Sequence, residues 1–205
     1  MQFKTDFIGA GDTLNFQAVY TDGASRYNFQ SLSVQSYGMF GSSSIPGVYQ
    51  SVGLAAVADG VFINGSGIDT VKTWGLRGAY NHNWDPYWNS ALYGAYAQLQ
   101  YGDAGKGFIC GGLRGGSIGG AVVAQPGIIN CNPDFNVAQI GVITRWTPVK
   151  NLTFSVDTIY TRLDQKFEGV LNVGTPLLAV AKPAARYQLK DQDTVSVLAR
   201  VQRNF

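Results

Sequence analysis

Few side chains in this 205-residue chain could carry acid–base or nucleophilic chemistry. His82 is the only histidine, and no serine or cysteine close to it in the sequence suggests a nucleophile paired with a base. It shares the strand parity of Tyr80 and Trp84 near an expected turn, which favours an aromatic-like role over that of a general base. We therefore predict that the chain is not an enzyme.

The glycine clusters at residues 105–107 and 115–120 do not match nucleotide-binding motifs. They lack the Gly-Lys-Ser/Thr of a P-loop and the third glycine of a dinucleotide fingerprint at the required spacing. We expect both clusters to lie in a flexible loop, and we expect no cofactor.

The two cysteines, Cys110 and Cys131, lie in one glycine-rich stretch with no histidine and no further cysteine between them. A metal site would lack ligands there, so we expect no metal. In a loop of an exported protein the two cysteines are expected to form a disulfide, and closing that loop would contribute about 3 kcal/mol through chain entropy. Two unrelated free thiols are the alternative.

The composition indicates a β-rich protein. Charged residues make up 14% of the chain, aromatic residues 13%, and 26 glycines are present, unlike a disordered or a typical helical sequence. The net charge of +2 and the dispersed basic residues suggest no nucleic-acid partner. Residues 45–63 are interrupted by proline and glycines, so we expect a loop there and no spanning helix. The N-terminal residues have no basic segment followed by an apolar run, so we expect no signal peptide in this chain.

Seven segments alternate apolar and polar side chains with the period of a β-strand. They are residues 2–7, 14–21, 73–84, 90–102, 137–147, 152–163 and 192–205. In the last segment Val195, Val197, Ala199, Val201 and Phe205 share an apolar face opposite Arg200. In residues 90–102 we assign the apolar face to Ala91, Tyr93, Ala95, Ala97, Leu99 and Tyr101.

The lengths of the strands and of their connections favour a membrane-spanning barrel. Strands of about 9 to 11 residues match a tilted crossing of the hydrocarbon core. Short turns at residues 9–12, 83–89 and 148–151 alternate with long connections at 22–71, 103–135 and 166–190, as in barrels with tight periplasmic turns and long external loops. Aromatic residues are expected to form two interfacial girdles. These comprise Trp84, Trp88, Trp146 and Phe205 at the periplasmic ends, and Tyr20, Trp74, Tyr101 and Tyr160 at the external ends.

Charged residues in the strands follow the polar parity. An arginine facing lipid at the midplane would cost about 2 to 4 kcal/mol, so we expect the polar face to point inward and to line a pore. The predicted pore-lining residues are Lys4, Arg77, Arg145, Asp157 and Arg200, with Asp6 on the same face. Arg203 shares the outward parity and can snorkel to headgroups. An excess of inward cations would bias a pore toward anions. The alternative is that these side chains only solvate a polar lumen or brace the barrel.

The combination of several segments resembles the alphaproteobacterial trimeric porins of Rhizobiales. The segments are residues 195–205, Cys-Gly-Gly-Leu-Arg at 110–114, residues 130–135 and the hairpin 143–154. The resemblance aligns the chain with the C-terminal half of such a porin. It implies an outer-membrane barrel of about sixteen strands, a homotrimer, and passive diffusion of ions and small hydrophilic solutes. It also implies that Phe205 is part of the C-terminal signal used by the barrel assembly machinery.

We therefore predict an all-β antiparallel transmembrane β-barrel fold with long external loops, in one domain over residues 1–205. Seven strands are fewer than the family's sixteen and odd in number, so we expect the chain not to close a barrel and its first strand to have an unpaired edge. One alternative is a small non-channel outer-membrane barrel acting as an anchor or adhesin. Another is a soluble secreted β-sandwich that binds a ligand.

Overall fold

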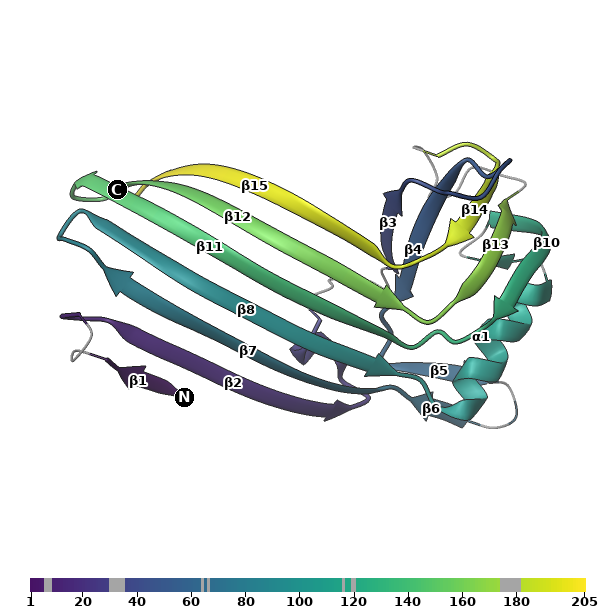
Figure 1. Ribbon diagram of the computed structural model, residues 1–205. Helices are drawn as coiled ribbons and strands as arrows, with labels where there is room; N and C mark the ends of the chain where they lie inside the picture. The colour runs from purple at the N-terminus through teal and green to yellow at the C-terminus, as the bar shows by residue number, and fades with distance from the viewer. Residues whose placement is uncertain are drawn as a thin grey trace.

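The computed structural model describes residues 1–5, 9–29, 36–63, 65, 67–115, 117–118, 121–173 and 182–205. Its largest element is an antiparallel sheet of seven strands in the order β1-β2-β7-β8-β11-β12-β15 (Figure 1). The strands are β1 (Gln2–Lys4), β2 (Thr13–Asp22), β7 (Lys72–Asn83), β8 (Trp88–Gln100), β11 (Phe135–Val149), β12 (Leu152–Gln165) and β15 (Gln192–Arg203). The seven predicted strands are confirmed, but the first ends at Lys4, and Asp6 and Phe7, which were predicted to belong to it, lie outside the described residues.

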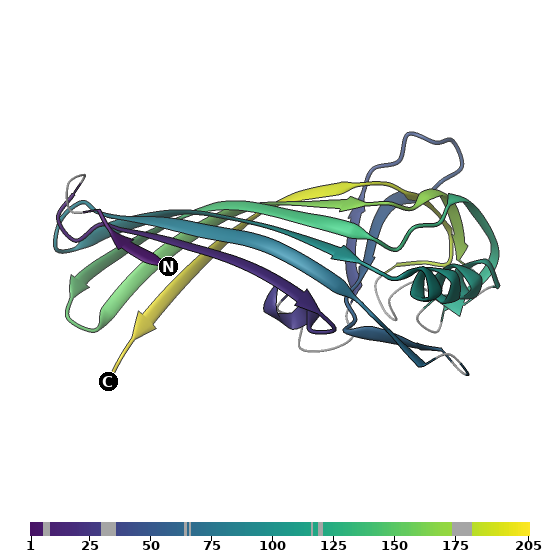
Figure 2. The ribbon, with the colours of Figure 1, turned by 90° about the horizontal axis from the view of Figure 1, so that it is seen from below.

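The seven-stranded sheet is open. β1 and β15 form its two edges, and within the described residues the strands do not close a barrel. Figure 2 shows its twist, with β15 crossing the direction of β2. The expected unpaired edge is therefore present at β1, which pairs only with β2 in the described part of the chain.

The short turns between the strands have identifiable local causes. Gly11 and Asn151 adopt positive φ angles of 79° and 68°, the left-handed conformation that glycine and asparagine tolerate best. Between β7 and β8, the Asp85 carboxylate accepts hydrogen bonds from the backbone N–H groups of Tyr87 and Trp88 at 2.7 and 2.8 Å. All three predicted short turns are confirmed, and the last two are shorter than expected because β8 already begins at Trp88 and β11 continues through Val149.

The face assignment in β8 was wrong. Arg77 of β7 lies opposite Ala95, and Arg145 of β11 lies opposite Asn89, so the odd-numbered residues of β8 share the face of the arginines. Leu92 is 53% exposed on the other face. The prediction failed because the odd-numbered face consists mainly of alanine and tyrosine, which suit either environment, while the even-numbered face mixes apolar residues with serine, glycine and glutamine.

The long connections contain further regular structure, contrary to the expectation of loops. A second sheet has the order β3-β4-β14-β13-β10-β9 and lies at one end of the long strands (Figure 1), and β5 pairs with β6. These strands are β3 (Ser36–Gly41), β4 (Gln50–Ala56), β5 (Gly60–Ile63), β6 (Gly67–Thr70), β9 (Ser117–Ile118), β10 (Ala121–Asn130), β13 (Glu168–Val173) and β14 (Arg186–Leu189). β4 is largely buried, so its sequence does not alternate in polarity as a half-exposed strand does.

Two buried clusters hold the second sheet together and join it to the ends of the long strands. One contains Val52, Leu171 and Tyr187 from β4, β13 and β14. The other contains Leu99, Tyr101 and Phe135 with apolar residues of the connections. Tyr101 is only 4% exposed and donates a hydrogen bond to the Ala56 carbonyl oxygen at 2.7 Å, so its expected place in the external aromatic girdle was wrong.

The glycine-rich residues 105–107 lie in a helix, α1 (Asp103–Gly115), and not in a flexible loop. The Asp69 carboxylate accepts a hydrogen bond from the Gly105 N–H at 2.6 Å, which satisfies a donor in the first turn. Ile109 and Leu113 pack against the buried clusters, and this packing offsets the poor helix propensity of glycine. None of the described helices is long and apolar enough to span a membrane.

Candidate functional site

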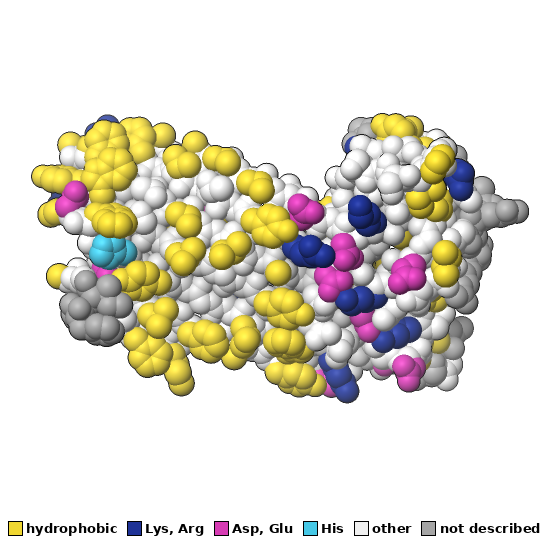
Figure 3. Space-filling model, in the orientation of Figure 1, with side chains coloured by type: hydrophobic (Ala, Val, Ile, Leu, Met, Phe, Trp, Pro, Cys, Tyr) yellow, Lys and Arg dark blue, Asp and Glu magenta, His cyan; other side chains and the backbone are white. Residues whose placement is uncertain are grey.

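One face of the seven-stranded sheet is apolar and exposed. Figure 3 shows this outer face, where hydrophobic side chains spread over the long strands and charged side chains gather next to the second sheet. Exposed residues on it include Leu14, Phe16, Tyr20, Trp74, Leu76, Ile140, Val142, Val156, Val195, Val197 and Val201. Among the charged groups, Lys166 pairs with Asp164 at 2.7 Å and Arg162 with Asp191 at 3.6 Å. An apolar face of this extent is typical of a surface in contact with lipid or another protein.

Aromatic side chains gather at the end of the outer face opposite the second sheet. The rings of Trp88 and Trp146 stack with their centroids 5.7 Å apart, and Trp146 contacts Phe154 at 5.4 Å. Phe205 follows β15 and is fully exposed, with the Arg203 guanidinium 5.6 Å from its ring centroid. These contacts match the arrangement expected for an interfacial girdle at the turns.

The opposite, inner face carries all five predicted pore-lining residues. Gln17, Arg77, Ala95, Gln139 and Thr161 lie in one row of cross-strand partners. A second row contains Asn89, Arg145, Ser155 and Arg200, with Asp157 two residues from Ser155. Lys4 pairs with Thr13, which shares the face of Gln17. Cross-strand partners and residues two apart project from the same face, so these side chains share one surface.

Three of the charged groups on the inner face form hydrogen bonds to neutral partners. The Arg77 Nε donates to Gln17 Oε1 at 2.7 Å, and the Arg145 Nη1 donates to Asn89 Oδ1 at 3.2 Å. Asp157 accepts a hydrogen bond of 2.6 Å from the Tyr93 hydroxyl, which reaches it over Gly141. The described inner face of this sheet thus has four cations and one carboxylate, and no ion pair joins them. The polar face is net positive.

A short segment after β2, residues 25–29, folds onto this inner face and was not predicted from the sequence; we call it the inward segment. It contains the 3-10 helix η1 (Ser25–Tyr27), which lies to one side of the sheet near the end of β2 (Figure 2). The Asn28 Nδ2 donates to Thr73 Oγ1 at 2.7 Å, and the Ser25 N–H and hydroxyl both donate to Asp59 Oδ1. Because these contacts join residues about 30 to 45 positions apart, no local sequence pattern signals them.

A pocket of about 310 Å³ lies between this segment and the sheet. Arg77 from β7, Gln139 from β11 and Thr161 from β12 contribute its polar groups. Asn28 and Phe29 contribute the wall from the inward segment. The pocket is therefore lined by one predicted pore-lining cation, Arg77, together with residues that were not predicted to be functional, such as Asn28 and Phe29.

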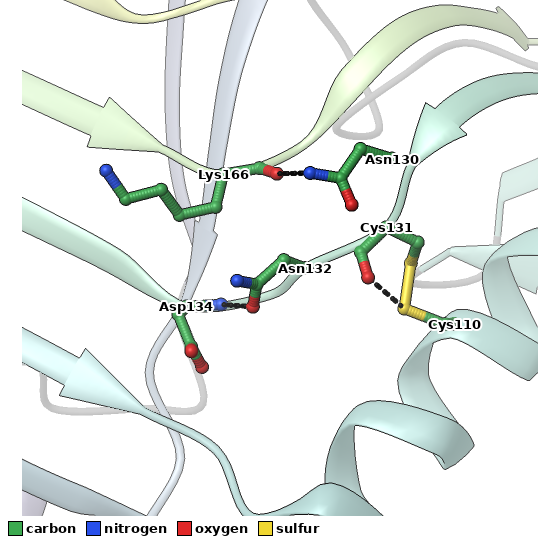
Figure 4. Close-up of a disulfide and its surroundings, with 6 residues drawn as sticks. All are labelled: Cys110, Asn130, Cys131, Asn132, Asp134 and Lys166. Carbon is green, nitrogen blue, oxygen red and sulfur yellow. Dashed lines mark hydrogen bonds between the residues drawn. A yellow bond between two sulfur atoms is a disulfide. The ribbon is translucent and has the colours of Figure 1, made fainter.

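The predicted disulfide between Cys110 and Cys131 is present, with the two Cα atoms 5.9 Å apart. It ties α1 to the segment between β10 and β11 (Figure 4). The same segment is held by the Asp134 N–H, which donates to Asn132 Oδ1 at 3.1 Å, and by an ion pair of 2.6 Å between Lys106 and Asp134. The cysteines thus have a structural role at the end of the long strands that adjoins the second sheet.

His82 lies among aromatic rings, as expected, and has a carboxylate partner that was not predicted. Its ring meets Trp84 edge-on with centroids 4.3 Å apart, and its Nδ1 lies 2.7 Å from Asp12 Oδ2. Asp12 also accepts hydrogen bonds from the Tyr80 hydroxyl and the Asn83 N–H, at 2.6 and 2.9 Å. The bond from Tyr80, followed by that from His82, lowers the pKa of Asp12 to about 2. This cluster ties the turn before β2 to the end of β7.

No metal-binding cluster of three His, Cys, Asp or Glu residues occurs within the described ranges. The polar groups of the described inner face are guanidinium, ammonium, amide and hydroxyl groups and one carboxylate. Such groups can orient and pass polar solutes.

Six antiparallel strands of 10 to 15 residues, apolar on one face and polar on the other, define the class of transmembrane β-barrel proteins. The porin subfamily matches residues 1–198, nearly the whole chain. The chain belongs to this family, whose proteins are channels of the bacterial outer membrane. Searches of curated proteins and of solved structures each gave no significant match.

Proposed function

We propose that this chain contributes to a water-filled outer-membrane pore through which ions and small hydrophilic solutes diffuse passively. The observation that supports this proposal is the pairing of an apolar outer face with an inner face whose charges have no ionic partners in the described residues. Charges removed from water without partners are costly, so this inner face requires water. A wide barrel supplies that water, whereas the interior of an eight-stranded barrel is filled by its own side chains.

The excess of cations favours anions in the proposed pore. Arg145 and Arg200 flank Ser155 in one row of the inner face, and Arg77 lies further along the sheet. A wall with this charge attracts anions and repels cations over roughly a Debye length of 10 Å at 0.1 M salt. If these side chains instead only solvate the lumen or brace the barrel, selectivity will not depend on them.

Planar-bilayer recordings of the full-length protein test this function. We expect ohmic conductance steps, and a reversal potential in a salt gradient that shifts toward cations in Arg145→Glu and Arg200→Glu. Arg203→Gln on the outer face is the control and should leave the reversal potential unchanged. Unchanged selectivity in both inner-face variants would refute the anion bias. If correctly inserted protein shows no conductance, the proposed pore is refuted and a non-channel barrel that acts as an anchor is favoured.

The resemblance of residues 110–114, 130–135 and 143–154 to the porins of Rhizobiales supports finer assignments. We assign the protein to this alphaproteobacterial group, with a homotrimer of barrels of about sixteen strands each. Conductance in steps of three would support the trimer. The exposed Phe205 beyond β15 supports a role in recognition by the barrel assembly machinery.

A soluble β-sandwich is not favoured by the exposure of the apolar face. In a sandwich the alternating apolar side chains would be buried between two sheets. Val195, Val197 and Val201 instead have exposed fractions of 64%, 66% and 64%. This face needs lipid or another protein surface to cover it.

A further inference from the structure

We propose that the pocket beneath the inward segment is a binding subsite for a small organic carboxylate, with Arg77 as the group that binds the anion. This proposal rests on the proposed pore, because solutes would reach the pocket from the lumen. It goes further in naming a place on the wall and a class of solute.

The inward segment is anchored both to the seven-stranded sheet and to the connection between β4 and β5. Asn28 bonds to Thr73 at 2.7 Å, and Ser25 makes two hydrogen bonds to Asp59 at 2.7 and 2.8 Å. Phe29 is 3% exposed, and its ring centroid lies 5.3 Å from that of Phe135. Hydrogen bonds on one side and ring packing on the other give the pocket a preformed wall.

Small residues make the floor of the pocket. Ala95 separates Arg77 from Gln139 in the cross-strand row, and Gly75 and Ala97 also line the pocket. The long side chains of Arg77 and Gln139 therefore lie on either side of a strip of short residues. The pocket of about 310 Å³ is the space above this strip. This volume corresponds to about ten water molecules, enough for a small organic ion.

Arg77 is oriented for an anion. Its Nε donates to Gln17, and its Nη2 makes a long contact of 3.4 Å with the Tyr27 carbonyl oxygen. Across the described chain no carboxylate forms an ion pair with it. A guanidinium has five N–H donors, so donors remain for a ligand after these two bonds.

The rest of the lining distinguishes a carboxylate with an organic part from an inorganic anion. Arg77 is the only cation in the described lining, whereas a phosphate dianion would favour a second positive charge. Phe29, Val19 and Val137 supply apolar surface for a hydrocarbon portion. On the opposite wall, Gln139 Nε2 donates to Thr161 Oγ1 at 2.9 Å and keeps a second N–H for the ligand.

Benzoate is the probe for this subsite, because it combines one carboxylate with a flat apolar group. In bilayer recordings with chloride as the carrier, benzoate should reduce the conductance of the full-length protein in a saturable manner. Arg77→Gln should raise the half-blocking concentration about tenfold or more, since it removes a charge-assisted hydrogen bond. Arg145→Gln is the matched control, because it removes the same charge from the same face outside the pocket. Ala95→Leu keeps every charge, fills the floor and should abolish the block.

Three results would overturn the subsite. Equal weakening in Arg77→Gln and Arg145→Gln would assign the effect to the general field of the lumen. If benzoate still blocks the Ala95→Leu variant, benzoate does not bind in this pocket. If inorganic phosphate blocks as strongly as benzoate and its block also depends on Arg77, the subsite is not selective for organic carboxylates.

Saturation-transfer NMR with benzoate on the detergent-folded protein separates this proposal from the proposed pore. Binding that is lost in Arg77→Gln and Ala95→Leu supports the subsite even if the protein does not conduct. A conducting channel whose benzoate signal is the same in the wild type and in both variants overturns the subsite and leaves the pore intact.

Discussion

Asp12 holds together two turns that are far apart in the sequence. Its carboxylate accepts hydrogen bonds from Tyr80 and from the Asn83 backbone and lies 2.7 Å from the His82 ring. These bonds favour the ionised carboxylate and lower its pKa from 3.8 to about 2. A depressed pKa means that folding is stabilised above the unfolded-state value near 3.8 and loses that stabilisation as the pH falls toward 2.

Asp12→Asn should therefore remove part of the acid sensitivity of folding. We expect the wild-type protein to exceed the variant in stability at pH 6, and the difference to shrink between pH 4 and pH 2. Urea unfolding in detergent, followed by tryptophan fluorescence at each pH, measures this difference. A difference that stays constant over the whole range would show that the Asp12 carboxylate does not titrate with folding.

Gly141 is required by the position of a tyrosine on the neighbouring strand. A Cβ atom at this residue would collide with the ring of Tyr93, whose hydroxyl bonds to Asp157. Gly141→Ala should displace the ring, break that hydrogen bond and lower the free energy of unfolding by about 1 to 3 kcal/mol. In the helical control Gly107→Ala, nothing lies within 4 Å of the added atom, and we expect stability to rise by about 0.5 to 1 kcal/mol. Similar unfolding midpoints for the two variants would contradict this account.

For charged residues the sequence predicted correctly which face of the sheet they occupy. For small or amphipathic residues it did not. Arg77, Arg145 and Arg200 could be assigned to the inner face because an arginine in lipid is costly. Tyr93 was assigned to the wrong face because its ring tolerates lipid while its hydroxyl seeks a polar partner.

At the scale of elements, α1 depends on its surroundings. It contains five glycines, each of which lowers helix stability by about 1 kcal/mol relative to alanine. Its tethers are the Asp69 carboxylate at its first turn and the disulfide from Cys110 to Cys131, which spans 21 residues. The helix should therefore be the first element to open when a tether is lost.

Replacing both cysteines by serine should destabilise the region around α1 by about 3 kcal/mol, the loss expected from loop entropy. We expect new protease cleavage within residues 103–115 under native conditions, while the β11–β12 hairpin remains intact. Limited proteolysis followed by mass spectrometry measures both regions in one sample. Identical cleavage with and without the disulfide would show that packing alone holds α1.

The long strands were predictable because each has one apolar and one polar face, which produces a period of two. The second sheet lacks this signal, since β4 is mostly buried and one of its two partners, β14, comes from a distant part of the chain. Segments such as residues 22–71 therefore resembled loops, although β3 and β4 pair over six residue positions within them.

At the scale of the whole molecule, the two faces of the seven-stranded sheet require different solvents. Val197→Arg would place a cation near the middle of the apolar face of β15, at a cost of about 2 to 4 kcal/mol in a bilayer. Ser196→Arg changes the adjacent residue on the inner face and is the matched control. We expect only Val197→Arg to reduce the fraction of protein that folds into lipid vesicles, as measured by electrophoretic mobility without heating. Equal folding of both variants would contradict the assignment of the faces.

The pairing of β4 with β14 also bears on the order of folding. Gln50 lies beside Tyr187 in a parallel register, although 137 residues separate them (187 − 50). Closing so long a loop is entropically costly and slow, and it requires both segments to have been exported. The hairpins of the long strands can form between neighbours, but the second sheet must wait until β14 (Arg186–Leu189) has arrived. Its completion is therefore a late event, and a chain arrested before residue 186 would leave β4 with an open edge.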